Sequence, residues 1–183
     1  MPEPLRTGRR VYLRHPVRGD VEELLALVRA SRRLHRPWVY PPSTAEAFSR
    51  YVDRAASERF LGFLVCSRED HAIAGVADLS EIVRGIFQSA YLGFYGHASY
   101  AGRGLMKEGL ELLLRHALHT LKLHRVEANV QPGNARSLAL VRSLGFHQEG
   151  FSPRYLKIGG RWRDHERWAL LVESYRVAAG IAR

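Results

Sequence analysis

The sequence predicts an α+β domain in which helices flank a mixed, mostly antiparallel sheet of about seven strands. Three observations support this prediction. Apolar residues alternate in strand-like runs in the first half, a glycine-rich turn at 101–106 links an apolar stretch to a helix, and a second strand–turn–helix unit follows at 124–146. A strand–helix–strand unit in mid-chain implies one parallel pair within the sheet. At 183 residues, the chain is sized for one domain spanning 1–183.

The first half of the chain is predicted to form a strand, two helices and three antiparallel strands. Alternation over 10–15 indicates the first strand, and Gly19-Asp20 precedes a helical apolar stripe. Pro37 and the two prolines after it end that helix in a loop, and Ser43-Thr44 begins a second helix that runs to about Arg59. The three strands are expected at 63–67, 72–82 and 86–95.

The second half contains the units that imply the parallel pair. A helix is expected from Leu105 to about Leu121, because its apolar residues repeat with the helical period. A strand at 124–130 follows, and then a capped helix at 135–144 that stops at Gly145. Two late strands, at about 151–158 and 162–170, are expected to complete the sheet.

The turn at 101–106 is the first candidate binding site. A glycine turn at a helix N-terminus directs unpaired backbone N–H groups at one point, where the helix dipole also favours a phosphate or diphosphate. Lys107 stands where a Rossmann fingerprint needs its third glycine, and no Gly-Lys-Ser/Thr sequence forms a Walker A loop. Considered alone, the turn fits equally well with glycines at positive φ and no ligand.

Composition is that of a folded, soluble protein. Hydrophobic residues make up 46% of the chain and aromatic residues 10%, which excludes general disorder, and no apolar run has the length of a membrane-spanning helix. The N-terminus does not resemble a signal peptide. The single Cys66 excludes a disulfide framework, lies in an apolar run typical of a core, and suits a reducing cytoplasm. We expect no membrane association and no metal.

The net charge of +10 has two interpretations. A basic surface favours the ribosome, a nucleic acid or an anionic cofactor. Only three of the 28 basic residues are lysines, however, and the arginines are spread along the chain, so a coding bias towards arginine explains the charge equally well. The best candidate for a functional basic patch is the set Arg29, Arg32, Arg33 and Arg36.

The order of these motifs resembles the GNAT family of acetyl-CoA-dependent N-acetyltransferases. Residues Ala101-Gly102-Arg103-Gly104-Leu105-Met106 match its diphosphate signature, and Asn134 with Leu144-Gly145-Phe146 matches its second element. Within the family, the chain resembles the ribosomal-protein-alanine N-acetyltransferases of the RimJ type. That likeness rests on Arg36-Pro37-Trp38, Val83-Arg84-Gly85, Tyr91-Leu92-Gly93 and Trp162-Arg163-Asp164-His165. The chain departs from the family at Ala101 and Met106, and at Asn129, where some relatives carry a glutamate base.

The resemblance implies that acetyl-CoA is the cofactor. The backbone of 101–106 is expected to hold its diphosphate, and the pantetheine arm to enter where the strand before the turn separates from its neighbour. Backbone groups of Phe94, Tyr95 and Gly96 are expected to polarise the thioester carbonyl. Asn134 and Ser137 are expected to contact the pantetheine arm, although Asn134 also suits a helix N-cap.

The chemistry needs a proton for the departing thiolate and a neutral amine. The resemblance implies Tyr155 or Ser137 as the proton donor; a phenol suits this role because its pKa lies above that of a thiol. Glu127 can act as base through a water held by Asn129, but pairing with an arginine explains Glu127 at least as well. Glu81, Asp164 and His165 are further candidates. An N-terminal amine, with a pKa of about 7.7–8, can also react without a dedicated base.

The RimJ-type resemblance implies that the acceptor is the alanine-like N-terminus of a protein, in particular a ribosomal protein. Two alternatives stay open: transfer to a small amine such as an amino acid, polyamine or antibiotic, and a non-catalytic acyl-CoA-binding regulator. The chain is expected to work in the cytoplasm, near the ribosome, as a monomer or homodimer. The acceptor groove is expected to be lined by Trp38, Tyr40, Glu81, Arg84, Trp162 and Asp164.

Overall fold

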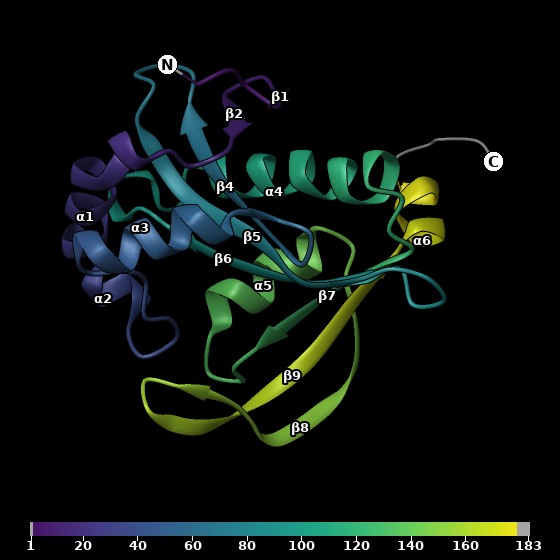
Figure 1. Ribbon diagram of the computed structural model, residues 1–183. Helices are drawn as coiled ribbons and strands as arrows, with labels where there is room; N and C mark the ends of the chain where they lie inside the picture. Colours follow the sequence, from purple (N-terminus) through teal and green to yellow (C-terminus); the bar gives the residue numbers. More distant parts are fainter. Residues whose placement is uncertain (1, 179–183) are drawn as a thin grey trace.

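The computed structural model describes residues 2–178 and contains one large sheet with helices on both faces (Figure 1). The sheet has nine strands in the order β1-β2-β4-β5-β6-β7-β9-β8, with β3 paired to β4 off this path. β6 and β7 run parallel, and every other recorded pair is antiparallel. The strands are β1 (Arg6–Thr7), β2 (Val11–Arg14), β3 (Ala56–Ser57), β4 (Phe60–Ser67), β5 (Ile73–Val83), β6 (Ser89–Gly96), β7 (Arg125–Val130), β8 (His147–Ile158) and β9 (Arg161–Leu171).

The helices divide between the two faces of the sheet. One face packs against α4 and α5, and this core includes Leu110 and Leu138. The other face packs against α1 and α3 through Leu24 and Phe48. The α-helices are α1 (Val21–Ala30), α2 (Arg32–His35), α3 (Ala45–Arg54), α4 (Leu105–Arg115), α5 (Ala135–Ser143) and α6 (Val172–Ala178). In Figure 1, α4 crosses the sheet while the β8–β9 hairpin extends away below it.

The predicted mixed sheet and its single parallel pair are confirmed, and the differences are local. Two additional strands, β1 and β3, have two residues each, which is too short for a periodic pattern to reveal. The helix predicted to reach Leu121 changes at His116 into a π-helical turn, His116–Thr120. The second predicted helix ends at Arg54 rather than Arg59, because the chain turns there into β3. No helix within residues 2–178 is both long and apolar enough to cross a membrane.

The separation of β6 from β7 determines where a ligand can enter. The two strands pair only at Ser89–Tyr91 with Arg125–Glu127. β6 continues to Gly96 while paired to β5, and β7 continues to Val130 while paired to β9. Beyond the paired segment the two strands therefore diverge, and the facing edge of each lacks a partner strand. This is the opening that the resemblance predicted.

Candidate active site

A cavity of about 1100 Å³ fills the space where β6 and β7 diverge. Its wall is formed by the last residues of β6 and β7, the glycine turn before α4, the N-terminus of α5, the segment after α2, and the β8–β9 hairpin. Predicted site residues at this wall are Trp38, Phe94, Tyr95, Gly96, Ala101, Gly102, Gly104, Met106, Asn129, Asn134 and Ser137. The fold thus brings together residues that lie up to about a hundred positions apart in the chain.

The glycine turn presents to this cavity a helix N-terminus that no side chain caps. Gly104 is the N-cap of α4, has φ +76°, and offers no side chain to the N–H groups of the first turn. Gly102 also has a positive φ, +77°, and open space on its Cβ side. The N–H groups at the start of an α-helix have no partners within the helix. The turn therefore has both the donors and the dipole that a diphosphate needs.

Arg10 contacts this turn and α4 from outside the cavity. Its guanidinium donates to the carbonyl of Arg103 at 2.9 Å and pairs with Glu108 of α4 at 2.9 Å. The Arg103 side chain itself turns away to Glu69, at 3.1 Å, and Leu105 is buried in the core beneath the helix. At these two positions, the turn offers a ligand its backbone rather than its side chains.

Met106, which departs from the family pattern, fits because two strands carry glycine beneath it. A Cβ on Gly75 of β5 would lie 2.2 Å from the Met106 sulfur, and a Cβ on Gly96 would lie 3.3 Å from its Cγ. The two glycines face each other in the β5–β6 register. Close approach of α4 to this pair keeps the helix N-terminus beside the end of β6.

The second helix N-terminus at the cavity belongs to α5. Asn134 is its N-cap, and its Oδ1 accepts from the backbone N–H of Ser137 at 3.2 Å. The capping interpretation of Asn134 is thus correct, and its side-chain NH₂ stays available to a ligand. Ser137 is half-buried, one turn into the helix, and lines the cavity.

Two amide side chains of the β7 segment point to the same side. Asn129 carries a buried Oδ1 that has no hydrogen-bond partner within the described structure, and the residue lines the cavity. Gln131 donates to the carbonyl of Trp38 at 3.1 Å and so ties the segment after α2 to the end of β7. The Trp38 ring lies against Gly133, where a Cβ would come within 3.0 Å of it. An unsatisfied acceptor in a cavity wall is a position that a polar ligand can fill.

Two buried histidines at the cavity are neutral and have one nitrogen free to accept. His35 Nε2 lies 2.8 Å from the Gly96 carbonyl, and His165 Nδ1 lies 2.9 Å from the Arg163 carbonyl. Because a carbonyl can only accept, these nitrogens carry the protons, and His35 Nδ1 and His165 Nε2 are left as acceptors. Burial lowers the pKa of both imidazoles. His165 was among the candidate bases, whereas sequence reasoning missed His35.

The other predicted catalytic residues lie beside the cavity rather than in its wall. Glu127 pairs with Arg125 at 2.9 Å, and Arg125 also bonds Glu149 of β8 at 2.9 Å. The arginine pairing considered for Glu127 is thus present. Tyr155 is half-buried on β8, with its ring 6.3 Å from the His165 ring, and its interaction with the Tyr91 hydroxyl is the main cause that raises the pKa of Tyr91 to about 12.

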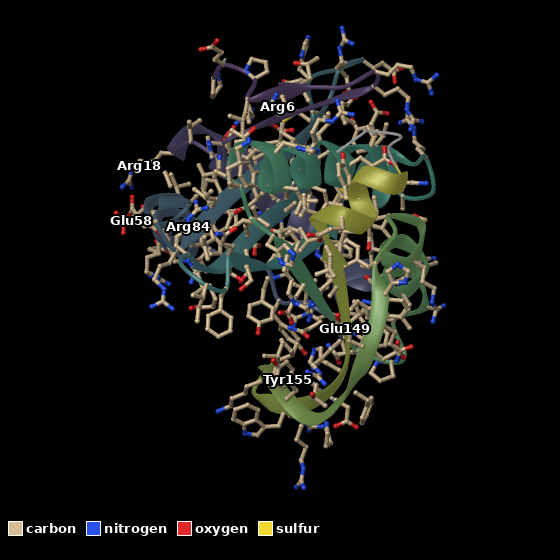
Figure 2. All side chains as sticks on the ribbon, turned by 90° about the vertical axis from the view of Figure 1, so that its right-hand side faces the viewer. Arg6, Arg18, Glu58, Arg84, Glu149 and Tyr155 are labelled. Atoms are coloured by element: carbon tan, nitrogen blue, oxygen red, sulfur yellow. The ribbon has the colours of Figure 1, made fainter. Side chains whose placement is uncertain are left out.

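Among the predicted acceptor residues, Trp38 alone lines the cavity. Tyr40 covers Gly159 in the β8–β9 turn, under the guanidinium of Arg36. Glu81 pairs with Arg59 at 2.5 Å on the surface, and Arg84 donates to the Leu121 carbonyl. Trp162 is 61% exposed, and Asp164 accepts from the Arg154 N–H at 2.7 Å. Figure 2 shows Arg84 well apart from Tyr155 of β8, and five of the six predicted acceptor residues lie outside the cavity wall.

Sequence reasoning also missed Asp78, an acidic residue in the middle of β5. Its side chain is half-buried, and burial raises its pKa to about 6 although the charge of Arg54 opposes this effect. The available signal was an acid inside the apolar run 73–79 of β5. No cluster of three or more histidine, cysteine, aspartate or glutamate side chains suited to a metal occurs within residues 2–178.

Comparison with known proteins identifies the family of this chain. Residues 10–147 match the model of the acetyltransferase (GNAT) domain. The chain belongs to the GNAT acetyltransferase family. It is therefore an N-acetyltransferase, and acetyl-CoA is its acyl donor. The exposed N-terminus of α4, the spare amide of Asn134 and the unsatisfied Asn129 oxygen fit such a molecule, which is anionic at one end and carries amides along its arm.

Two relatives and one solved structure show which acetyltransferases the chain is similar to. A probable N-acetyltransferase of Bacillus subtilis (strain 168), YjcK, is 30% identical over 172 residues, or 90% of this chain and 95% of that protein. The [ribosomal protein uS5]-alanine N-acetyltransferase of Escherichia coli (strain K12) is 43% identical over 107 residues, or 58% of this chain and 55% of the relative. Among solved structures, Mycobacterium smegmatis RimJ in complex with CoA-disulfide superposes with a TM-score of 0.81. It is 27% identical, with 99% of this chain and 95% of that chain covered.

Proposed function

We propose that this GNAT enzyme transfers an acetyl group to the N-terminal amine of a protein, in particular a ribosomal protein that begins with alanine or a similarly small residue. The main support for this proposal is the cavity between β6 and β7, which extends from the glycine turn at 101–106 to Trp38 and the β8–β9 hairpin. A donor can therefore enter from one end and an extended peptide from the other. The 43% identity to a uS5-alanine N-acetyltransferase supports this acceptor class.

The residues that would hold acetyl-CoA lie on two neighbouring helix N-termini. The backbone of 101–106 would bind the diphosphate, and Asn134 would use its side-chain NH₂ on the pantetheine arm. Backbone groups of Phe94, Tyr95 and Gly96 lie on the diverging part of β6, where they can polarise a carbonyl. When bound, acetyl-CoA supplies the activated acetyl thioester.

The residues that would move protons lie on both walls of the cavity. His165 would accept the proton of the amine at Nε2, because burial keeps this imidazole neutral and its Nδ1–H is held by the Arg163 carbonyl. Ser137 would give a proton to the departing sulfur from the α5 side. Tyr155 is the alternative donor, and a movement of the β8–β9 hairpin would have to bring it into the wall that it now adjoins. Glu127, which pairs with Arg125, is the alternative base and would act through a water held by Asn129.

Work close to the ribosome, and hence a cytoplasmic location, is part of this proposal. Arg29, Arg32, Arg33 and Arg36 are all exposed on α1, α2 and the segment after them, and Arg33 also lines the cavity. A basic rim at the acceptor entrance favours approach to the phosphates of ribosomal RNA.

A panel of acceptors tests the proposal. The purified enzyme is given acetyl-CoA with peptides copied from ribosomal protein N-termini, with their first residue varied, and with spermidine and an aminoglycoside. We expect the highest kcat/KM for peptides that begin with alanine or serine. Efficient acetylation of a polyamine or an aminoglycoside without peptide transfer would show that the acceptor is a small amine. Binding of acetyl-CoA without transfer to any acceptor would indicate a regulator.

A further inference from the structure

Asp78 lies in the middle of β5, directly across from a glycine on each neighbouring strand. The sheet register pairs it with Gly62 of β4 and with Gly93 of β6. A Cβ on Gly93 would lie 2.7 Å from Asp78 Oδ1, so the carboxylate leans over the bare Gly93 backbone. Gly93 lines the cavity, so the Asp78 carboxylate lies directly beside a glycine of the cavity wall, on the part of β6 that no longer pairs with β7.

Two tyrosine hydroxyls without hydrogen-bond partners in the described structure share this face of the sheet. Tyr51 of α3 reaches over Gly62, where a Cβ would lie 2.6 Å from its hydroxyl. Tyr95 follows Gly93 by two positions on β6 and is more than nine-tenths buried. Burial, and after it the negative charge of Asp78, raises the pKa of both tyrosines.

The charge of Asp78 is only partly compensated within residues 2–178, since the charge of Arg54 lowers the pKa of Asp78 less than burial raises it. No arginine, lysine or histidine within residues 2–178 forms a salt bridge with it, and the guanidinium of Arg54 stacks instead over the Phe60 ring at 3.9 Å. A desolvated carboxylate without a partner weakens a fold. A cationic group bound beside the carboxylate and the two hydroxyls would offset this cost.

We propose that Asp78, Tyr51 and Tyr95 form the binding site for the positively charged amino end of the acceptor. An ammonium group carries three N–H donors, and the carboxylate and the two hydroxyl oxygens are acceptors that can receive them. The inference rests on the proposed transfer to an amine and names the residues that recognise it. Asp164 and Glu81, the two acids expected in the acceptor groove, do not form this site, because their carboxylates are engaged elsewhere.

This assignment gives the cavity two ends of opposite charge. The N-terminus of α4 at 101–107 attracts the anionic donor, whereas Asp78 attracts the cationic acceptor. The amino end would be drawn to β5 and β6 on the α1–α3 side of the sheet, and the donor would be held at α4. The charges at these two ends would therefore favour the donor at α4 and the amino end of the acceptor at Asp78.

A binding experiment separates charge recognition from a structural role. Calorimetry on the enzyme saturated with CoA compares an alanine-initiated peptide that has a free N-terminus with the same peptide acetylated at that nitrogen. We expect the native enzyme to prefer the free peptide by roughly tenfold or more, since hydrogen bonds to charged groups are the strong ones. Asp78→Asn should bind the two peptides equally. Asp53→Asn, which neutralises an exposed acid of α3 that pairs with Arg18, should keep the preference.

Turnover gives a second readout and separates this inference from the proposed function. Asp78→Asn should raise the acceptor KM about tenfold or more while the Kd of acetyl-CoA stays unchanged, and Tyr95→Phe should raise KM less. If the native enzyme acetylates spermidine but no peptide, the proposed acceptor is wrong, and the KM of spermidine then tests Asp78. An Asp78→Asn enzyme with native preference and KM would overturn the inference. Should that variant not fold, the same result for a Tyr51→Phe, Tyr95→Phe double variant would overturn it.

Discussion

Gly102 offers the sharpest test of the diphosphate site, because Gly85 provides a matched control. Both glycines have a positive φ, +77° and +68°, and neither would bring an added Cβ within 4 Å of another atom. Gly102 lines the cavity, whereas Gly85 lies in the exposed β5–β6 turn. Gly102→Ala and Gly85→Ala therefore introduce the same backbone strain, but only the first places a methyl group in the cavity.

The expected magnitudes follow from these geometries. A left-handed conformation costs a non-glycine residue about 1–2 kcal/mol, so both variants should lose a similar amount of stability. At Gly102 the methyl group would also displace the diphosphate from at least one backbone N–H group. A hydrogen bond to a charged group is worth about 1.5–3 kcal/mol, which corresponds to an affinity loss of roughly 10- to 150-fold.

Calorimetric titration with acetyl-CoA and thermal unfolding of both variants measure the two effects separately. We expect equal decreases in Tm, of about 2–8 °C, and a weakened acetyl-CoA affinity for Gly102→Ala alone. Equal acetyl-CoA affinities in the two variants would refute the placement of the diphosphate at this turn. A stability loss confined to one variant would refute the strain argument.

Three further predictions concern catalysis and stability. Ser137→Ala and Tyr155→Phe should show which of the two residues donates the proton to the thiolate. The variant that lacks the true donor should have a kcat about a hundredfold lower at unchanged acetyl-CoA affinity. Native turnover in both single variants and in the double variant would exclude both residues as donors. Burial raises the pKa of Asp78 from 3.8 to about 6, so its ionisation removes stability as pH rises between those values. In denaturant titrations, the Asp78→Asn variant should thus be about 2–3 kcal/mol more stable than the native protein at pH 7.5 and equally stable below pH 4. Equal stability of the two proteins at both pH values would contradict the burial of this charge. Arg14 and Asp20 form a buried ion pair at 2.7 Å. Asp20→Asn should lower the free energy of unfolding by about 3–5 kcal/mol, because it leaves the Arg14 guanidinium without a counterion. A loss below about 1 kcal/mol would show that water reaches the pair.

Periodic patterns were sufficient to predict the central elements of the fold. The apolar stripe after Leu105 and the alternation at 124–130 correspond to α4 and β7, and the unit that they form with the preceding strand gives the parallel pair. Such patterns report burial over several turns or residues. They do not report two-residue strands such as β1, and the apolar stripe of this helix does not reveal the change to π-helical geometry at His116.

The cofactor end of the candidate site was more predictable than the acceptor end. Residues 101–106 and Asn134 lie in local motifs, and most of them line the cavity. The acceptor residues depend on irregularities of the strands instead. Glu81 has φ +47° at a shift in the β5–β6 register and points to Arg59 on the surface. Asp164 accepts from Arg154, which also has a positive φ, at a shift in the β8–β9 register.

Asp78 shows the opposite case, because its proposed site depends on long-range strand pairing and not on a local motif. Its neighbours Gly62 and Gly93 lie 16 and 15 positions away in the chain, and their role appears only in the register of β4, β5 and β6. Tyr51 joins them from α3, and Tyr95 from β6. A sequence alone shows an acid within an apolar strand, but not which groups surround it.

The central claim is that the cavity between β6 and β7 presents an N-terminal amine to acetyl-CoA. Its most direct test is the position of the acetyl group on one peptide that carries both an N-terminal alanine and an internal lysine, incubated with the enzyme, acetyl-CoA and an equal concentration of spermidine. Fragmentation mass spectrometry then locates the product. We predict acetylation of the α-amine, with the lysine and the spermidine left unmodified. Acetyl groups found only on the lysine or the spermidine would contradict the claim.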